Sequence, residues 1–322
     1  MINIERKIIE SKPIQFLIEK SKKIILPGFE KLPLYDVVKF FIKQTQEIGL
    51  NERAASIAFN FLMAVPPFFI FLFTLLSNMP GSKRLYDEVL IIVKTVMPDE
   101  STFLIIKDVM DDFFLPGTGL LSFGLLLALY FSSNATLTIM RTFTKSMLHI
   151  EVEKRNFLQL RWDAIKLTML IVLLVFATIF ILLTQTIVLN WLLDRIHIKD
   201  YFSDLILNII QILIIFFLIF VAIGLIYRYA PNVQKKWKVR SPGAILATIL
   251  VMAFTYLFSY WVNNISSYNK VYGSLGSILI LMFLVFVNSL VLLIGFELNV
   301  SINSLKSIAA KRNKHHYYDE QT

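Results

Sequence analysis

The chain has 322 residues, of which 56% are apolar, 14% aromatic and only 17% charged, and its mean hydropathy is +0.66. This composition is too apolar for a soluble domain of this size and indicates a polytopic membrane protein. There is no cysteine, which excludes disulfides, thiolate metal sites and cysteine nucleophiles. The N-terminal residues 1–23 mix acids and bases and have no uninterrupted apolar region or small-residue cleavage site, so we do not expect a signal peptide.

The first segment, residues 1–53, is predicted to be a cytoplasmic amphipathic region. In residues 34–50, LYDVVKFFIKQTQEIGL, apolar residues recur roughly at helical spacing against lysines and acids. This pattern is typical of a helix that lies on the membrane surface.

Six windows are long and apolar enough to cross a hydrocarbon core, which takes about 20 residues. We therefore predict an all-α fold, a polytopic bundle of six transmembrane helices with amphipathic interfacial helices. The transmembrane domain covers residues 54–305, and a polar cytoplasmic tail covers 306–322, of which the part from Lys311 onward is expected to be mobile. The spans lie near 54–77, 117–140, 164–190, 204–229, 242–262 and 274–300.

The distribution of basic residues predicts the orientation. Lysine and arginine collect in cytoplasmic flanks. If both termini are cytoplasmic, only seven of the 32 lie on the outer side, namely Lys83, Arg84, Lys94, Lys107, Arg195, Lys199 and Lys270. The tryptophans agree, because they prefer the membrane interface and all fall at or just beyond predicted span ends, at Trp162, Trp191, Trp237 and Trp261.

The longest outer loop follows the first span and is predicted to form two short amphipathic helices, at 82–97 and 101–114. Its acids outnumber its bases, which is the sign expected away from the cytoplasm. We expect these helices to cap the outer mouth of the bundle.

The first span carries a polar stripe and two prolines at mid-span. Asn60 lies on this stripe with Pro67, while Pro66 and Pro67 together remove two backbone donors. A proline also clashes with the carbonyl four residues earlier, so a kink is expected. This kink is either a hinge or cavity wall on a transport pathway, or a static bend packed by neighbouring helices.

Two further asparagines lie in predicted spans. Asn134, near the end of the second span, either lines a pathway or hydrogen-bonds a neighbouring helix. Asn288, near the middle of the last span, shares one helical face with Gly295 and Asn299 and is expected to face the interior of the bundle.

Four charged residues fall at the predicted cytoplasmic boundary of four different spans: Arg53, Arg141, Arg228 and Glu297. They either form an ion-paired girdle or a basic port for an anionic headgroup, or each extends separately to the interface. Glu297 cannot satisfy three guanidinium groups, so part of the excess positive charge is expected to meet an anionic ligand or lipid phosphate.

The residues give little support for an enzyme. The acidic group Asp108, Asp111 and Asp112 lies on the outer side and is typical of a solvated amphipathic face. The four histidines are scattered, and no phosphate-binding loop, serine nucleophile motif or zinc protease motif is present. The net charge of +9 is explained by topology and anionic lipid. We therefore expect no catalytic residues, no metal or cofactor and no nucleic acid partner.

Four stretches resemble the BrkB/YihY family of bacterial inner-membrane proteins: ERAASIAFNFLMAVPPFFIFLFTLL, IYRYAPN, SPGAILATIL and YGSLGSILILMFLVFVNSLVLLIGFELN. By order and spacing the resemblance covers residues 30–305, although 141–205 match only in hydropathy. It implies six spans with both ends inside the cell and a transport role for ions or lipids, while an older ribonuclease label of the family is regarded as a misassignment.

The predicted function is thus a transporter or translocator of an ion or an anionic lipid-like substrate in the bacterial cytoplasmic membrane. Its pathway would be lined by the first, second, fourth and sixth spans, and its partners would be membrane lipids with anionic headgroups. The alternative is a scaffold that helps envelope assembly without transport, and a membrane-bound hydrolase fits less well. A polar cavity reaching Asn60 or Asn134 would favour transport, and an exposed apolar groove would favour the scaffold.

Overall fold

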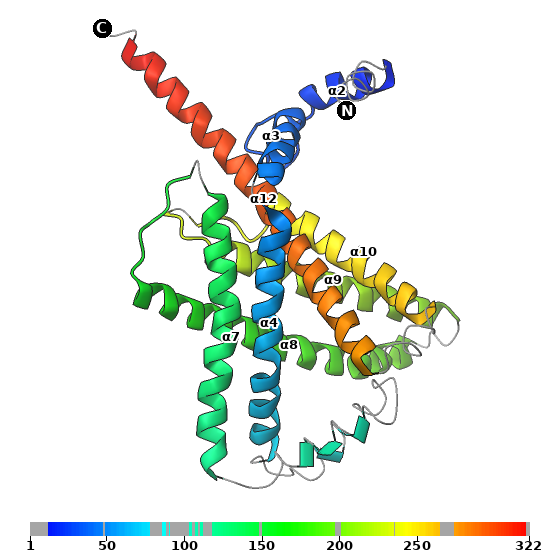
Figure 1. The fold of residues 1–322 in the computed structure, drawn as a ribbon. Helices are drawn as coiled ribbons and strands as arrows, with labels where there is room; N and C mark the ends of the chain where they lie inside the picture. The colour runs from blue at the N-terminus through cyan, green and yellow to red at the C-terminus, as the bar shows by residue number, and fades with distance from the viewer. Residues whose placement is uncertain are drawn as a thin grey trace.

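The computed structural model describes residues 12–47, 49–77, 118–147, 150–196, 201–234, 236–264 and 274–319, together with a few residues between 86 and 111. The fold is all-helical, as predicted (Figure 1). The described part of the chain contains eight helices: α2 Lys12–Lys23, α3 Leu34–Glu47, α4 Leu50–Ser77, α7 Thr118–Ser146, α8 Phe157–Ile196, α9 Tyr201–Tyr229, α10 Pro242–Asn264 and α12 Ser274–Asp319.

Each predicted span corresponds to one helix, in the order α4, α7, α8, α9, α10 and α12, although residue 117 at the start of the second span lies outside the described residues. Among the described residues, three stretches are both long and apolar enough to cross a membrane: Ile209–Tyr229, Pro242–Val262 and Leu279–Ala310. These belong to α9, α10 and α12. They support a chain that crosses a membrane several times, and the count of six spans stays a prediction.

The six long helices follow one another in a closed cycle. Each contacts the next one along the chain, from α4 through α7, α8, α9 and α10 to α12, and α12 returns to contact α4. Figure 1 shows α4 and α7 side by side, with α12 crossing near the start of α4. Sequential elements tend to be neighbours in space, and the return of α12 to α4 closes the arrangement.

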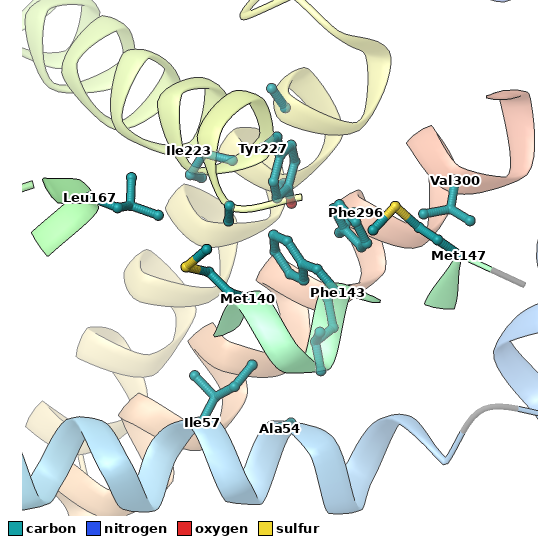
Figure 2. Packing of buried hydrophobic residues seen from close by; sticks show 14 of the residues in the cluster. Ala54, Ile57, Met140, Phe143, Met147, Leu167, Ile223, Tyr227, Phe296 and Val300 are labelled. Atoms are coloured by element: carbon teal, nitrogen blue, oxygen red, sulfur yellow. The ribbon is translucent and has the colours of Figure 1, made fainter. Parts of the chain in front are cut away.

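The buried core gathers at one end of this bundle, which we call the packed end. Its residues come from the first turns of α4, α8 and α10, the last turns of α7 and α9, and the middle of α12 (Figure 2). Phe143 and Phe296 stack at its centre with ring centroids 3.6 Å apart. Away from this end many large apolar side chains are exposed, including Phe180, Phe217 and Phe283. In the predicted orientation the packed end is cytoplasmic.

The helix α3 confirms the amphipathic helix predicted before the first span. It buries Val37 against Phe29 and Ile302, so it packs on the later part of α12. The helix α2, which precedes it, was not predicted from the sequence.

The last helix is longer than its predicted span. It runs for 46 residues to Asp319 and includes most of the segment assigned to a mobile polar tail. Residues just beyond the span, such as Ile302 and Ser304, are still buried. The helix continues past residue 300 where α3 packs against it, and the polar composition of the segment does not end it.

Most of the predicted outer loop, including Asp112, lies outside the described residues. Two segments of it are connected where Tyr86 donates a hydrogen bond to Asp111. Partial burial and the neighbouring Asp111 carboxylate raise the pKa of Tyr86 to about 12.

Candidate functional site: a buried ion pair at the packed end

The most unusual side chain at the packed end is Glu297, which is fully buried on α12. Its Oε1 lies 3.2 Å from Nη1 of Arg53 on α4, which forms an ion pair. Its Oε2 accepts a hydrogen bond from Nε2 of Gln44 on α3 at 2.8 Å, and Oε1 also accepts one from the hydroxyl of Ser146 on α7. The carboxylate is therefore held from three other helices.

Arg53 completes the connection to α7. Its Nη2 donates to the backbone carbonyl of Thr142 and to the Ser146 hydroxyl, and Gln44 donates to the Ser146 carbonyl at 3.3 Å. The last turn of a helix has carbonyls without intrahelical partners and carries the negative end of the helix dipole. A guanidinium group is therefore well suited to the end of α7.

We call Glu297, Arg53, Gln44 and Ser146 the Glu297 network. A buried ion pair is not in itself strong evidence of stability, because removing two charges from water costs several kcal/mol. Leaving one of the charges unpaired is much worse, on the order of 3–5 kcal/mol. The network therefore requires α3, α4, α7 and α12 to assemble in one arrangement.

The structure brings together two of the four charged residues predicted to share the cytoplasmic boundary. Arg53 and Glu297 pair, whereas Arg141 is exposed on α7. The guanidinium carbon of Arg228 lies 5.7 Å from the ring centroid of Tyr229. Within the described residues, Arg53 is thus the one arginine that contacts Glu297.

The residues of the predicted hinge lie on α4, which continues through Pro66 and Pro67 to Ser77. Asn60 is half-buried, and its amide donates to the carbonyl of Ser56 at 2.9 Å. The backbone therefore satisfies the donor of Asn60, and a hinge at the prolines stays a prediction.

Asn134 meets a residue that the sequence did not single out. Its Oδ1 accepts a hydrogen bond from Arg161 at the start of α8. The Arg161 guanidinium also donates to the carbonyl of Tyr130 at 3.2 Å and lies 4.5 Å from that ring. Arg161 could be counted only as a basic flank, because nothing in its local sequence indicates which helix it faces.

Asn288 and Asn299 share a helical face, as the spacing predicted, but their environments differ. Asn288 donates to Leu284 one turn back, and its buried Oδ1 has no partner among the described residues. Asn299 accepts from the Gly243 amide and donates to the Ser241 hydroxyl, both at 2.9 Å. It therefore holds the start of α10.

Two glycines, Gly243 on α10 and Gly295 on α12, lie where these two helices touch. The Ser241 hydroxyl accepts a hydrogen bond from the Ala244 amide at 3.3 Å, so Ser241 is the N-cap of α10. A side chain at Gly243 would collide with the Gly295 carbonyl. A Cβ at Gly295 would lie 2.5 Å from the Gly243 carbonyl oxygen and 2.7 Å from Cβ of Ala247. The absence of both side chains lets α10 and α12 touch at their backbones.

Replacing Asn299 with leucine is expected to lower the free energy of unfolding by about 1–3 kcal/mol, because the buried Gly243 amide loses its acceptor. Thermal unfolding of the purified protein in detergent, followed by tryptophan fluorescence, measures this effect. Asn303→Leu is the control, since Asn303 bonds only the Asn299 carbonyl one turn back. Equal losses from the two variants would contradict the assigned role of Asn299.

No group of three or more His, Asp or Glu residues in the described part of the chain could hold a metal ion.

The fold and this site define a class: a helical membrane protein that crosses the bilayer several times and holds a buried charged network at one end. Residues 41–320 match the family model described as Virulence factor BrkB. The chain therefore belongs to the BrkB family, as the resemblance in its sequence indicated.

Relatives in other bacteria agree with this assignment. The chain is 26% identical over 283 residues to the ribonuclease-like protein YfkH of Bacillus subtilis (strain 168), covering 86% of this chain and 98% of the relative. It is 35% identical over 83 residues to UPF0761 membrane protein IL2447 of Idiomarina loihiensis, covering 26% of this chain and 29% of that one. It is 31% identical over 87 residues to UPF0761 membrane protein XCC0860 of Xanthomonas campestris pv. campestris, covering 27% and 20%. No solved structure matches the chain.

Proposed function

We propose that the protein is a non-enzymatic translocator that moves an ion or an anionic lipid-like substrate across the bacterial cytoplasmic membrane. The Glu297 network is its latch, and it holds the packed end closed on the cytoplasmic side. The observation that carries the proposal is a fully buried carboxylate whose partners come from three other helices of one bundle.

The Glu297 network can act as a latch because its four side chains come from four helices and hold one buried carboxylate together. If α4 moves away from α12, Arg53 and Glu297 are each left buried without their counter-charge, so intermediate positions are costly. If α3 moves away, the ion pair remains but the carboxylate loses its hydrogen bond from Gln44. Elements that have two discrete arrangements and no cheap intermediate are the ones that act as gates.

The location of other polar groups also favours transport. The Asn134–Arg161 contact and the unpartnered Oδ1 of Asn288 both lie on helices that also form the packed end. Polar groups within predicted membrane spans are costly and usually mark a substrate path or a helix contact. These groups are candidates for a path that continues from the latch into the membrane.

The test is transport by the purified protein in liposomes, with ion flux and lipid scrambling measured on the same preparation. Gln44→Ala removes one arm of the latch and keeps the ion pair, so it is expected to raise the wild-type rate severalfold. Gln46→Ala is the matched control, because Gln46 is exposed on the same helix. A wild-type protein that moves neither ions nor lipids would overturn the translocator.

That negative result would select the scaffold instead. The amphipathic helix α3 supports the scaffold. It buries Val37 and Gln44, whereas Val38 is 40% exposed and Ile42 is 49% exposed on another side of the helix. Such a surface can bind a membrane or a partner without any transport.

A further inference from the structure

A pocket of about 670 Å³ lies between α3 and the later part of α12. One side of it is charged, with Lys39 and Lys43 one turn apart on α3 and Asp36 beside them. The rest is apolar, formed by Phe40 and by Leu305 and Ile308 of α12. Sites that bind small amphipathic molecules commonly have this size and this mixture of apolar walls with a few polar groups.

We propose that this pocket binds one anionic phospholipid, with the phosphate between Lys39 and Lys43 and the start of an acyl chain along Phe40 and Ile308. The site is separate from the Glu297 network, and lipid binding there does not depend on translocation being the function of the protein.

The charge of the pocket selects the headgroup. Two lysines face one carboxylate, so the site has a net positive charge that suits a phosphate diester. Basic residues near a membrane surface attract anionic lipid. Asp36 would repel a second negative group but can accept a hydrogen bond from a headgroup hydroxyl. Phosphatidylglycerol satisfies all three side chains, because it carries one negative charge and two hydroxyl groups.

The surroundings favour a lipid over free phosphate. On α3, the exposed apolar residues Val38 and Ile42 lie next to Lys39 and Lys43 along the chain. A helix with lysines beside exposed apolar residues is typical of the membrane interface, where the lysines reach the headgroups. An inorganic ion would use the lysines and leave the apolar wall of the pocket unused.

The pocket and the Glu297 network share the helix α3. Gln44, which bonds Glu297, directly follows Lys43 and lies one turn after Phe40. A lipid that steadies α3 therefore steadies one arm of the Glu297 network. If the protein is a translocator, phosphatidylglycerol is expected to change its transport rate through this helix.

The binding test uses the full-length protein in nanodiscs that contain a photoactivatable phosphatidylglycerol, followed by mass spectrometry of the labelled peptides. Label is expected on residues 32–43 and 305–309. Lys39→Gln/Lys43→Gln should reduce it about tenfold. Lys154→Gln/Lys238→Gln is the matched control, since it removes the same charge from two exposed residues outside the pocket and should keep the label.

A second variant separates shape from charge. Ala309→Trp fills the pocket without altering its charge and should also abolish the label, while thermal unfolding confirms that the variant is folded. Equal labelling by a photoactivatable phosphatidylcholine, full labelling of Lys39→Gln/Lys43→Gln, or displacement of the label by millimolar inorganic phosphate would each overturn the proposal. Lipid binding with no transport in the liposome assay would leave this site standing and remove only the translocator.

Discussion

Replacement of Glu297 by leucine is expected to destabilise the protein by about 3–5 kcal/mol, the usual cost of leaving a buried charge without its partner. Arg53 would then keep only the Thr142 carbonyl and the Ser146 hydroxyl in a buried site. Gln44 would lose its carboxylate acceptor as well. The midpoint of thermal unfolding in detergent measures the loss.

The decisive control is the double variant Arg53→Met/Glu297→Leu. Because it removes both charges and fills their volume with apolar atoms, it is expected to recover most of the stability lost by Glu297→Leu. The stability of the double variant, compared with that of the two single variants, gives the coupling free energy between Arg53 and Glu297. If the double variant loses as much stability as the two single variants together, Arg53 and Glu297 are not coupled. That result would contradict the assignment of the Glu297 network as a latch.

Replacement of Gly243 by valine is expected to have the second largest effect, a loss of about 3 kcal/mol or more, because overpacking of a tight contact forces the backbone to shift. Any side chain at this position meets the Gly295 carbonyl of α12. The shift would also draw the Gly243 amide away from Asn299. We expect a lower unfolding midpoint and a smaller yield of monodisperse protein.

The matched control on the same helix is Ala253→Val, which adds bulk where α10 is exposed. This variant is expected to stay within about 0.5 kcal/mol of the wild type, as is usual for surface changes. Comparable losses from Gly243→Val and Ala253→Val would show that α10 is sensitive to bulk everywhere and that the glycine contact has no special role.

The positions of the long helices could be predicted because hydrocarbon imposes a simple rule on the sequence. A span needs about 20 apolar residues, and these runs stand out from the polar loops. α10 begins at Pro242, because proline suits the first turn of a helix and Ser241 caps it. The end of α12 was missed because residues just beyond the predicted span, such as Ile302 and Ser304, are buried by tertiary contacts that the local sequence does not show.

The candidate site could be predicted only in part. The sequence places Arg53, Arg141, Arg228 and Glu297 near one depth, but the choice of partner depends on how each helix is rotated. Arg53 pairs with Glu297, a residue 244 positions away. Arg141 lies on the same helix as Ser146, which bonds Glu297, yet Arg141 is exposed. The sequence did not indicate that Gln44 belongs to the site, because a glutamine on an amphipathic helix is expected to face solvent.

The closing contact between the first and last long helices also sets the order of assembly. Arg53 enters the membrane region early, but its partner is made 244 residues later. At synthesis rates of about 5–20 residues per second this delay is roughly 10–50 s. During that time Arg53 lacks its carboxylate partner, and its guanidinium group can be solvated by water or paired with a lipid phosphate. The Arg53–Glu297 ion pair can therefore form only after α12 has been made and inserted.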